Sequence, residues 1–449
     1  MDPIEILYRQ YLNQPVVTTD SRNITPGCIF FALRGSRVDG HTFAAQSLAN
    51  GAALVVIEDE KFLPAPQHAH FPRYVLVPDV LKALQDLARH HRRQFHIPVI
   101  GITGSNGKTT TKELISAVLS SHYPTHYTKG NFNNHLGLPL TLLSMPAETE
   151  VAVIEMGASI PGDIELLCNI AEPTHGLITN IGKAHLEGLG GLEGVKKEKS
   201  ALYRFLALTD GMAFINMNEP YLAELAQPVY KKLYYTQSEA PSLEHRPYEI
   251  KLLSTDPFVS VAFLDDRGEG VEVHSQLIGT YNFPNIMTAI VLGRYFKVPM
   301  EKIKAAIEQY IPSNNRSQIV DWQGNMLIKD AYNANPNSMR AALENLSRQK
   351  ASKKIAILGD MLELGEGELE EHRQIIAFAE SCGIPQILLV GPLFGAANSG
   401  KHSNFENAPA LRSWWQEHPV DGACILLKGS RGMRLETLLE PAEKEQSSL

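Results

Sequence analysis

The sequence predicts an α/β protein of three domains. Short apolar runs alternate with segments of helical periodicity along most of the chain, as expected for strands separated by helices. A glycine-rich turn stands between one such strand and a helix at residues 99–111. The 449 residues correspond to three domains at about 150 residues each.

Composition excludes several classes of protein. The 44% hydrophobic and 20% charged residues are typical of a globular chain with an ample core. A net charge of -8 gives no reason to expect a nucleic-acid partner. The N-terminus lacks the basic flank and apolar stretch of a signal peptide, and no apolar run approaches the ~20 residues that span a bilayer. Four scattered cysteines without C-x-x-C spacing argue against a disulfide framework or structural zinc. We therefore expect a soluble cytoplasmic protein without membrane insertion.

Residues 1–82 are predicted to form a small α/β domain. Cys28–Leu33 and Ala53–Ile57 have the apolar character of strands, and a helix is expected between them from Phe43 to Asn50. Asp79 has the character of an N-cap for a following helix that runs to the polar residues 90–93. The first domain boundary is placed near this helix.

Residues 83–312 are predicted to form a central domain on a parallel sheet. Val151–Ile154 and Gly176–Ile181 have the composition of buried strands. An irregular, β-rich insertion is expected from Tyr234 to Gln276, followed by a helix from Asn285 to Phe296. Pro312–Asn315 is interpreted as a linker.

Residues 313–449 restart the alternation of strands and helices. Strands are expected at Ile355–Leu358, Ile387–Val390 and Cys424–Leu427, with helices between them. This pattern predicts a second open, Rossmann-like α/β domain. The polar tail from Glu443 to Leu449 is expected to be frayed.

The segment Val99–Thr111 has the sequence form of a phosphate-binding loop. Apolar residues lead into Gly-Ser-Asn-Gly, and Lys108 then opens a helix. Such a loop offers backbone N–H groups and a helix N-terminus to phosphates, while a Thr109 hydroxyl suits Mg²⁺. The strict G-x-x-x-x-G-K-[ST] pattern is missed by one place, because Ile102 stands where the first glycine belongs. The alternative is an ordinary strand-to-helix turn with a chance lysine.

Polar residues follow other predicted strands, where ligands bind in open parallel sheets. Glu155 ends one strand and His185 follows another, although the first also suits a helix cap and the second a structural role. Mg²⁺ prefers oxygen ligands, so a histidine ligand needs independent support. From spacing alone, the charged residues 196–200 are predicted to lie on a solvent-exposed helix face. Asp330 suits either a simple loop or a role facing phosphate or water at a domain cleft.

These segments together resemble the Mur ligase family over nearly the whole chain. The matching strings are Thr103–Thr111, Asn131–Asn134, Glu155–Ala158, Asn180–Gly188, Gly279–Asn285, Asp330–Met339, Leu358–Gly365 and Lys428–Arg431, with Thr19–Arg22, Phe30–Gly35 and Asp39–His41 in the first domain. The strings Tyr332–Pro336 and Gly359–Gly365 are most similar to those of members that add D-alanyl-D-alanine to UDP-MurNAc-tripeptide.

The resemblance implies an amide ligase that consumes ATP through an acyl-phosphate intermediate. It implies that the first domain holds the UDP-linked precursor, the central domain ATP, and the last domain D-Ala-D-Ala. A monomer without nucleic-acid or membrane partners is expected. The third peptide residue (diaminopimelate or lysine) and the order of substrate binding are not specified by the sequence.

The resemblance also implies roles for individual residues. Lys108, Lys199 and Asp330 are expected to be catalytic. Lys199 aligns with a lysine that is carbamylated in the family, although the usual Lys-Gly-Glu is Lys-Ser-Ala here. The ATP site is expected to comprise Gly104, Ser105, Asn106, Gly107, Lys108, Thr109, Thr110, Asn282, Asn285, Arg316 and Asp330. The other substrates are expected at Ser21, Arg22, Asn131, Asn134, Asn333 and Asn335, and two Mg²⁺ ions at Thr109, Glu155, His185 and Lys199.

Two other functions remain open at this stage. One is a different amide ligase of the same fold, which adds another amino acid or a folate glutamate. Against the diaminopimelate-adding members, the last domain has no Asp-Asn-Pro-Arg string. The other is a non-catalytic nucleotide sensor, which would not need the acid, the histidine and the last domain. A P-loop kinase or GTPase fits poorly, because the chain continues into a second α/β domain.

Overall fold

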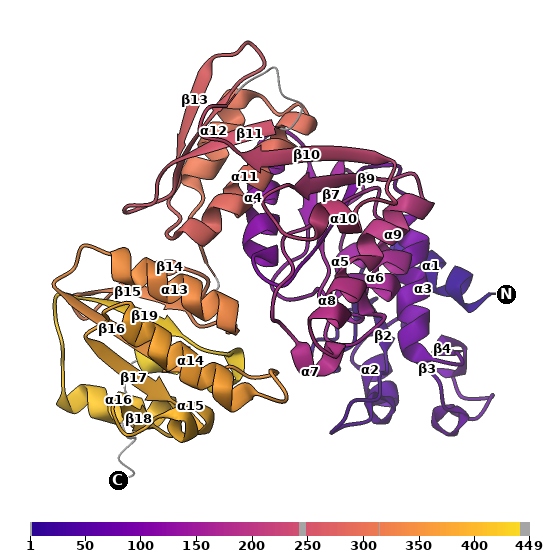
Figure 1. Ribbon diagram of the computed structural model, residues 1–449. Coiled ribbons are helices and arrows are strands. Elements are labelled where there is room, and N and C mark those ends of the chain that lie inside the picture. The colour runs from indigo at the N-terminus through magenta and orange to yellow at the C-terminus, as the bar shows by residue number, and fades with distance from the viewer. Residues whose placement is uncertain (1, 242–247, 314, 441–449) are drawn as a thin grey trace, which may run out of the picture.

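The computed structural model describes residues 2–241, 248–313 and 315–440 (Figure 1). These residues form three sheets of four, nine and six strands, which follow one another along the chain. The predicted three-domain α/β fold is confirmed. In the part of the chain so described, no helix is long and apolar enough to cross a membrane.

The first sheet is small and entirely parallel, in the order β1-β2-β3-β4. The expected helix between its two central strands is present as α2, which covers it with a short 3₁₀ turn at Gly40–Phe43. The elements of this domain are α1 (Pro3–Asn13), β1 (Val17–Thr18), β2 (Ile29–Phe31), α2 (Ala44–Ala49), β3 (Leu54–Ile57), β4 (Tyr74–Leu76) and α3 (Val80–Arg92).

The helix α3 begins as the sequence predicts. The Asp79 carboxylate accepts a hydrogen bond from the backbone N–H of Lys82 at 2.8 Å, which satisfies one of the free N–H groups of the first turn. The predicted boundary after residue 82 falls inside this helix. The exact division at this point stays a prediction.

Replacing Asp79 with alanine is expected to lower the free energy of unfolding by about 1 kcal/mol, because the first turn of α3 loses its cap. Urea denaturation followed by circular dichroism measures the change. Asp79→Asn keeps the acceptor oxygen and serves as the control. Equal stability of Asp79→Ala and the parent protein would contradict the capping role.

The second sheet has the order β13-β12-β11-β10-β9-β8-β5-β7-β6, with parallel pairing from β6 to β11 and antiparallel pairing at β11-β12 and β12-β13. Its strands are β5 (Val99–Thr103), β6 (Thr125–Tyr127), β7 (Val151–Glu155), β8 (His175–Ile178), β9 (Met212–Asn216), β10 (Lys231–Gln237), β11 (Tyr248–Ser254), β12 (Ser260–Leu264) and β13 (Gly270–His274). The region 234–276, predicted to be an irregular insertion, instead continues the main sheet; 242–247 lie outside the described residues. Periodicity alone does not reveal which strand a hairpin will pair with.

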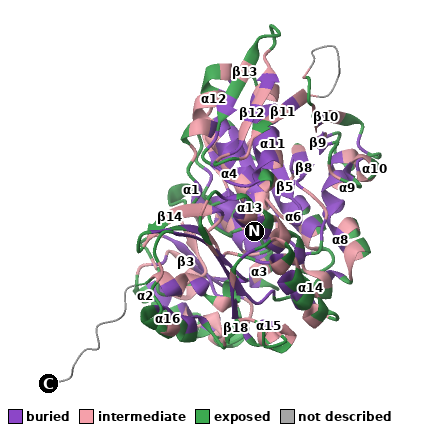
Figure 2. Cartoon of the chain, turned by 60° about the vertical axis from the view of Figure 1, so that its left-hand side comes forward, coloured by how far each residue is buried: buried purple, intermediate pink, exposed green. Residues whose placement is uncertain are grey.

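Helices cover both faces of this sheet, and alternate residues of β5 enter different cores. Val99 packs with α3, α5, α6 and α9, whereas Ile100 and Ile102 pack with α4, α11 and α12. Figure 2 shows the buried residues along the strands and the exposed ones on the outer helix surfaces. The helices of this domain are α4 (Lys108–Ser120), α5 (Gly137–Leu143), α6 (Asp163–Ala171), α7 (Leu186–Leu189), α8 (Leu192–Lys199), α9 (Ala201–Leu208), α10 (Leu222–Leu225), α11 (Phe283–Tyr295) and α12 (Met300–Gln309).

The first and second domains share one hydrophobic core. Leu7 of α1, Phe31 of β2 and Leu84 of α3 belong to the same buried cluster as Leu142 of α5 and Leu167 of α6. The Tyr11 hydroxyl also donates a hydrogen bond to the Leu143 carbonyl at 2.6 Å. The two domains are therefore joined by continuous apolar packing.

The third sheet starts with an antiparallel hairpin and continues in parallel, in the order β14-β15-β19-β16-β17-β18. The three predicted strands are present as β16, β17 and β19, while the hairpin has no counterpart in the sequence prediction. The elements are β14 (Gln318–Trp322), β15 (Asn325–Asp330), α13 (Pro336–Arg348), β16 (Lys353–Gly359), α14 (Glu368–Ser381), β17 (Gln386–Val390), α15 (Pro392–Ala397), β18 (Ser403–Phe405), α16 (Ala408–Glu417) and β19 (Ala423–Lys428). The tail expected to be frayed lies outside the described residues, as does residue 314 of the expected linker.

Candidate active site

A cavity of about 700 Å³ lies where the central and C-terminal domains face each other. The loop before α4, the end of β7 and the start of α11 supply one side of it. The loop that follows β15 supplies the other side. The predicted residues that line the cavity are Ser105, Asn106, Gly107, Lys108, Thr109, Thr110, Asn131, Asn134, Glu155, His185, Asn282, Asn285, Arg316, Asp330, Asn333 and Asn335.

The glycine-rich segment forms a tight loop between β5 and α4, as predicted. Gly104 has φ +143°, and a Cβ there would lie 2.0 Å from the Thr179 hydroxyl. Gly107 has φ +78°, and a Cβ there would meet the Asn285 side chain at 2.7 Å. Both positions therefore require glycine, for conformation as well as for space. The loop leaves the N-terminus of α4 open toward the cavity.

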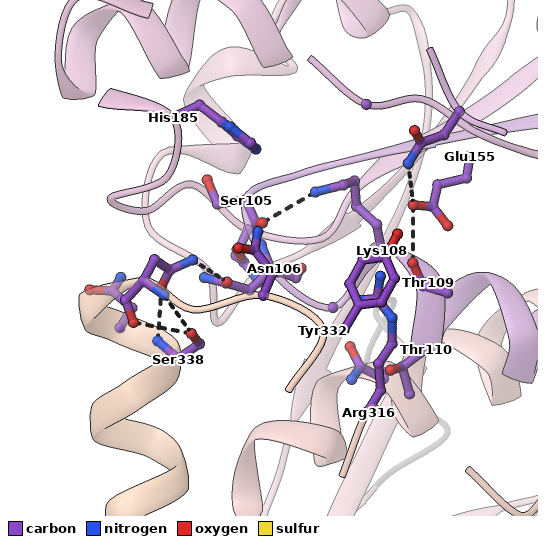
Figure 3. A pocket seen from close by; sticks show the side chains of 18 of the residues that line it. Ser105, Asn106, Lys108, Thr109, Thr110, Glu155, His185, Arg316, Tyr332 and Ser338 are labelled. Carbon is purple, nitrogen blue, oxygen red and sulfur yellow. Dashed lines mark hydrogen bonds between the residues drawn. The ribbon is translucent and has the colours of Figure 1, made fainter. Parts of the chain in front are cut away.

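The Lys108 side chain curls back over this loop (Figure 3). Its ammonium donates to the backbone carbonyls of Gly104 at 2.6 Å and Ser105 at 3.2 Å. Burial lowers the pKa of Lys108 to about 8, against the opposing attraction of the Glu155 carboxylate. A phosphate group in the loop would favour the charged form of this amine.

Glu155 has the environment expected of a cation ligand. One carboxylate oxygen accepts hydrogen bonds from the Thr109 hydroxyl at 3.1 Å and the Asn133 amide at 2.8 Å (Figure 3). The other oxygen is buried and has no hydrogen-bond partner within the described part of the chain. Since an unpaired buried carboxylate oxygen is costly, and Mg²⁺ takes oxygen ligands, these residues fit a magnesium ion.

Among the residues 2–241, 248–313 and 315–440, no three acidic, histidine or cysteine side chains converge as a metal cluster. His185 lines the cavity, but its Nδ1 pairs with the Glu363 carboxylate of the C-terminal domain at 2.6 Å. The nearby imidazole lowers the pKa of Glu363. The four-residue metal set therefore stays a prediction, with Thr109 and Glu155 as the two members in direct contact.

Lys199 is buried at the end of α8, next to the cavity but not among its lining residues. The solvated face predicted from spacing is wrong for this residue, which is 1% exposed, and for its neighbour Glu198. The Glu198 carboxylate accepts hydrogen bonds from the N–H groups of Gly162 and Ile164 and so caps α6. Among the residues that the structure describes, none forms a hydrogen bond with the Lys199 amine. Burial, together with the charge of Lys108, lowers the pKa of Lys199 to about 7.

The C-terminal domain brings a charged pair and two stacked groups to the cavity. The Lys428 ammonium donates to the Asp330 carboxylate at 2.7 Å and to the Asn333 carbonyl at 3.1 Å. The Arg316 guanidinium lies over the Tyr332 ring at 3.8 Å, and no described residue forms a hydrogen bond with its buried Nε. Asp330 therefore has a cationic partner in Lys428, whereas the Nε of Arg316 has no partner among the described residues.

Two asparagine contacts organise the polar surface. Asn335 caps α13 and also donates to the Asn106 side chain at 2.7 Å, which joins the C-terminal domain to the phosphate loop. Asn285 donates to Asn282 at 2.9 Å, and its carbonyl oxygen accepts from Thr111 at the same distance. The predicted adenine pair is thus held in one orientation. Asn134 caps α5 through two backbone N–H groups.

Some predicted residues do not line the cavity. Gly104 belongs to the loop but not to the cavity lining, and Ser21 and Arg22 belong to the first domain, where Arg22 pairs with Asp20 at 2.8 Å. Sequence reasoning missed Asn133, Asn180 and Tyr332 as functional residues, although each lies within a quoted motif. The Asn180 side chain accepts from the backbone N–H of Asn106 at 2.9 Å and so supports the phosphate loop.

Models of known protein families match the chain in three consecutive parts. Residues 15–92 match "Mur ligase family, catalytic domain", residues 102–293 "Mur ligase middle domain", and residues 315–431 "Mur ligase, glutamate ligase domain".

Whole proteins are similar over nearly the full length. The UDP-N-acetylmuramoyl-tripeptide–D-alanyl-D-alanine ligase of Bacillus subtilis is 36% identical, over 94% of this chain and 92% of that protein. The crystal structure of MurF from Acinetobacter baumannii is 33% identical with a TM-score of 0.81, over 94% and 92% of the two chains. The MurF ligase from Thermotoga maritima, solved in complex with ADP, is 26% identical with a TM-score of 0.82, over 94% and 96%.

Proposed function

The chain belongs to the Mur ligase family of ATP-dependent acid–amino-acid ligases, and we propose that it adds D-alanyl-D-alanine to UDP-N-acetylmuramoyl-tripeptide. One observation carries this proposal: a single cavity unites the phosphate loop of the central domain with the loop Asp330–Ser338 of the C-terminal domain. The full-length similarity to D-alanyl-D-alanine ligases supports the choice of amine. The product would be the pentapeptide precursor of the cell wall.

The reaction requires activation of a carboxylate, which is a poor electrophile. Transfer of the ATP γ-phosphoryl group to the tripeptide carboxylate gives an acyl phosphate and ADP. The amine of D-Ala-D-Ala then attacks the acyl carbon, loses a proton, and expels inorganic phosphate as the amide forms. Lys108 and the N-terminus of α4 are placed to stabilise the charge that develops on the phosphoryl oxygens.

Thr109 and Glu155 are the residues that would hold Mg²⁺, with His185 as a further ligand. A bound Mg²⁺ ion supplies charge neutralisation between the phosphates and the reacting carboxylate. We assign the contacts to ATP to residues 104–110, Asn282, Asn285, Arg316 and Asp330. Carbamylation of Lys199 would replace a buried cation by an anion suited to a second Mg²⁺ ion. It is supported by the burial of the amine and its lowered pKa.

The roles of the remaining parts follow from the same proposal. The first domain, residues 1–82, would hold the UDP-linked precursor through Ser21 and Arg22. The central domain, residues 83–312, would hold ATP. The last domain, residues 313–449, would hold the dipeptide through residues such as Asn333 and Asn335. Asn131 and Asn134 stand on the central side of the cavity for the tripeptide. A monomer suffices, because one chain supplies the whole cavity, and we place its activity in the cytoplasm.

The test is ATP-dependent phosphate release with UDP-MurNAc-tripeptide, with and without D-Ala-D-Ala. Diaminopimelate and lysine tripeptides are assayed in parallel, and the product is identified by mass. We expect release only with both substrates and a pentapeptide product. Release with a single amino acid in place of the dipeptide, and none with D-Ala-D-Ala, would assign the chain to another ligase of the family. ATP binding without release in any mixture would favour a nucleotide sensor.

A further inference from the structure

Two loops from different domains meet beside the cavity. Residues 182–188, which follow β8, contact residues 361–371, which follow β16. His185 Nδ1 lies 2.6 Å from the Glu363 carboxylate, and the Lys183 ammonium lies 2.5 Å from that of Glu371. A Cβ on Gly365 would lie 3.1 Å from Cβ of Glu187, so the backbones are closely packed here.

Both members of the His185–Glu363 pair have an unusual backbone. His185 has φ +52° and Glu363 has φ +69°, in the left-handed region that residues other than glycine rarely adopt. Such conformations persist when surrounding contacts determine them, and they are common at functional sites. The neighbouring pair differs, because neither Lys183 nor Glu371 has a positive φ.

The chemistry of imidazole gives this geometry a consequence. A neutral imidazole has one donor nitrogen and one acceptor nitrogen. A carboxylate at Nδ1 favours the proton on that nitrogen and leaves the lone pair on Nε2. Histidines that ligate metals usually donate their other N–H to such a partner, which fixes the tautomer and the ring orientation.

We propose that Glu363 is a positioning residue that holds His185 with Nε2 ready for a divalent cation, so that the C-terminal domain completes a cation site of the central domain. The inference rests on the proposed function, in which His185 serves the nucleotide-bound cation. His185 lines the cavity, and in Figure 3 its ring points toward the side of the phosphate loop where the Lys108 ammonium lies. Glu363 thus acts on the cation site through His185 and does not contact the reacting atoms.

The alternative is that Glu363 only holds the two domains together. The Lys183–Glu371 pair provides a matched control, because it joins the same loops through a carboxylate but does not contact the imidazole. Loss of either pair removes one interdomain contact. Only loss of Glu363 removes the partner of His185.

The experiment measures Mn²⁺ binding to the full-length protein with ADP, by electron paramagnetic resonance. Variants are Glu363→Ala, Glu363→Gln, Glu371→Ala, His185→Ala and the double variant of His185 and Glu363, each checked for folding by circular dichroism. We expect Glu363→Ala to weaken Mn²⁺ binding about tenfold, as second-layer partners of metal ligands do. Glu363→Gln keeps an acceptor oxygen and is expected to retain most of the affinity, and Glu371→Ala all of it.

The double variant should bind Mn²⁺ no more weakly than His185→Ala alone. An equal loss in Glu371→Ala and Glu363→Ala would overturn the proposal, as would unchanged Mn²⁺ affinity in Glu363→Ala or His185→Ala. A further loss in the double variant would also overturn it. The measurement needs neither tripeptide nor D-Ala-D-Ala, so failure of the ligation assay and failure of this inference are distinguishable.

Discussion

Replacing Lys108 with alanine is expected to reduce kcat for ATP-dependent ligation about a hundredfold to a thousandfold, the scale of removing a key charge-stabilising donor. The ammonium lies on the phosphate loop, where negative charge would develop on the transferring phosphoryl group. Its hydrogen bonds within the described residues run to carbonyls of its own loop, so the fold should survive its removal. Phosphate release and the thermal melting of the variant are the measurements.

Lys302→Ala is the control for this variant. Lys302 is an exposed lysine on α12, so its loss removes the same charge away from the cavity. Its kcat should match that of the parent protein. A folded Lys108→Ala protein that ligates at the parent rate would refute the role of this loop in phosphate transfer.

Replacing Lys199 is expected to abolish ligation and to stabilise the fold at the same time. The folded-state pKa of about 7 lies below the ordinary value of 10.5, so the unfolded chain binds more protons between these pH values. The parent protein therefore becomes more stable as pH rises from 7 to 10.5. Below pH 7 both states are protonated and the full cost of the buried charge applies. Lys199→Met should exceed the parent in stability by about 5 kcal/mol there, in CO₂-free buffer, and the gap should close toward pH 10.5.

Denaturation of both proteins across this pH range provides the measurement, with Lys197→Met, at an exposed position on the same helix, as control. In the activity assay, short carboxylic acids should partly restore Lys199→Ala, whereas bicarbonate should restore it poorly. Full activity of Lys199→Ala without any additive would remove this residue from the mechanism. A stability gap that does not change with pH would contradict the buried charge.

The sequence was a good guide where local chemistry determines structure. The strand, glycine turn and Lys108 helix are all specified within residues 99–120, and Asp79 caps the helix it was expected to cap. The mismatch with the strict phosphate-loop pattern has no consequence, because the glycines that the geometry needs are Gly104 and Gly107. The early Gly101 is a strand residue.

Features that depend on contacts between distant segments were not predictable from spacing. The helix α8 has a charged sequence, yet Lys199 and Glu198 face inward because Glu198 caps α6, a helix formed about 30 residues earlier. The partner of His185 lies in another domain, at Glu363. The hairpin β14–β15 and the placement of β11–β13 likewise depend on the neighbouring strand rather than on local pattern.

The hydrophobic core shared by the first two sheets has a consequence for how the chain can be divided. Three sheets do not correspond to three separate cores. The helix α3 contributes Val80, Leu84 and Leu87 to apolar packing that extends through both, so a fragment ending at residue 82 would be cut through that packing. The C-terminal domain has two hydrophobic clusters that consist largely of its own residues. It contacts the phosphate loop through polar side chains. The first two sheets therefore form one packing unit, and the third sheet contacts it through polar groups. If the first domain holds the UDP-linked precursor, as proposed, this shared core would set the distance between that precursor and the phosphate loop.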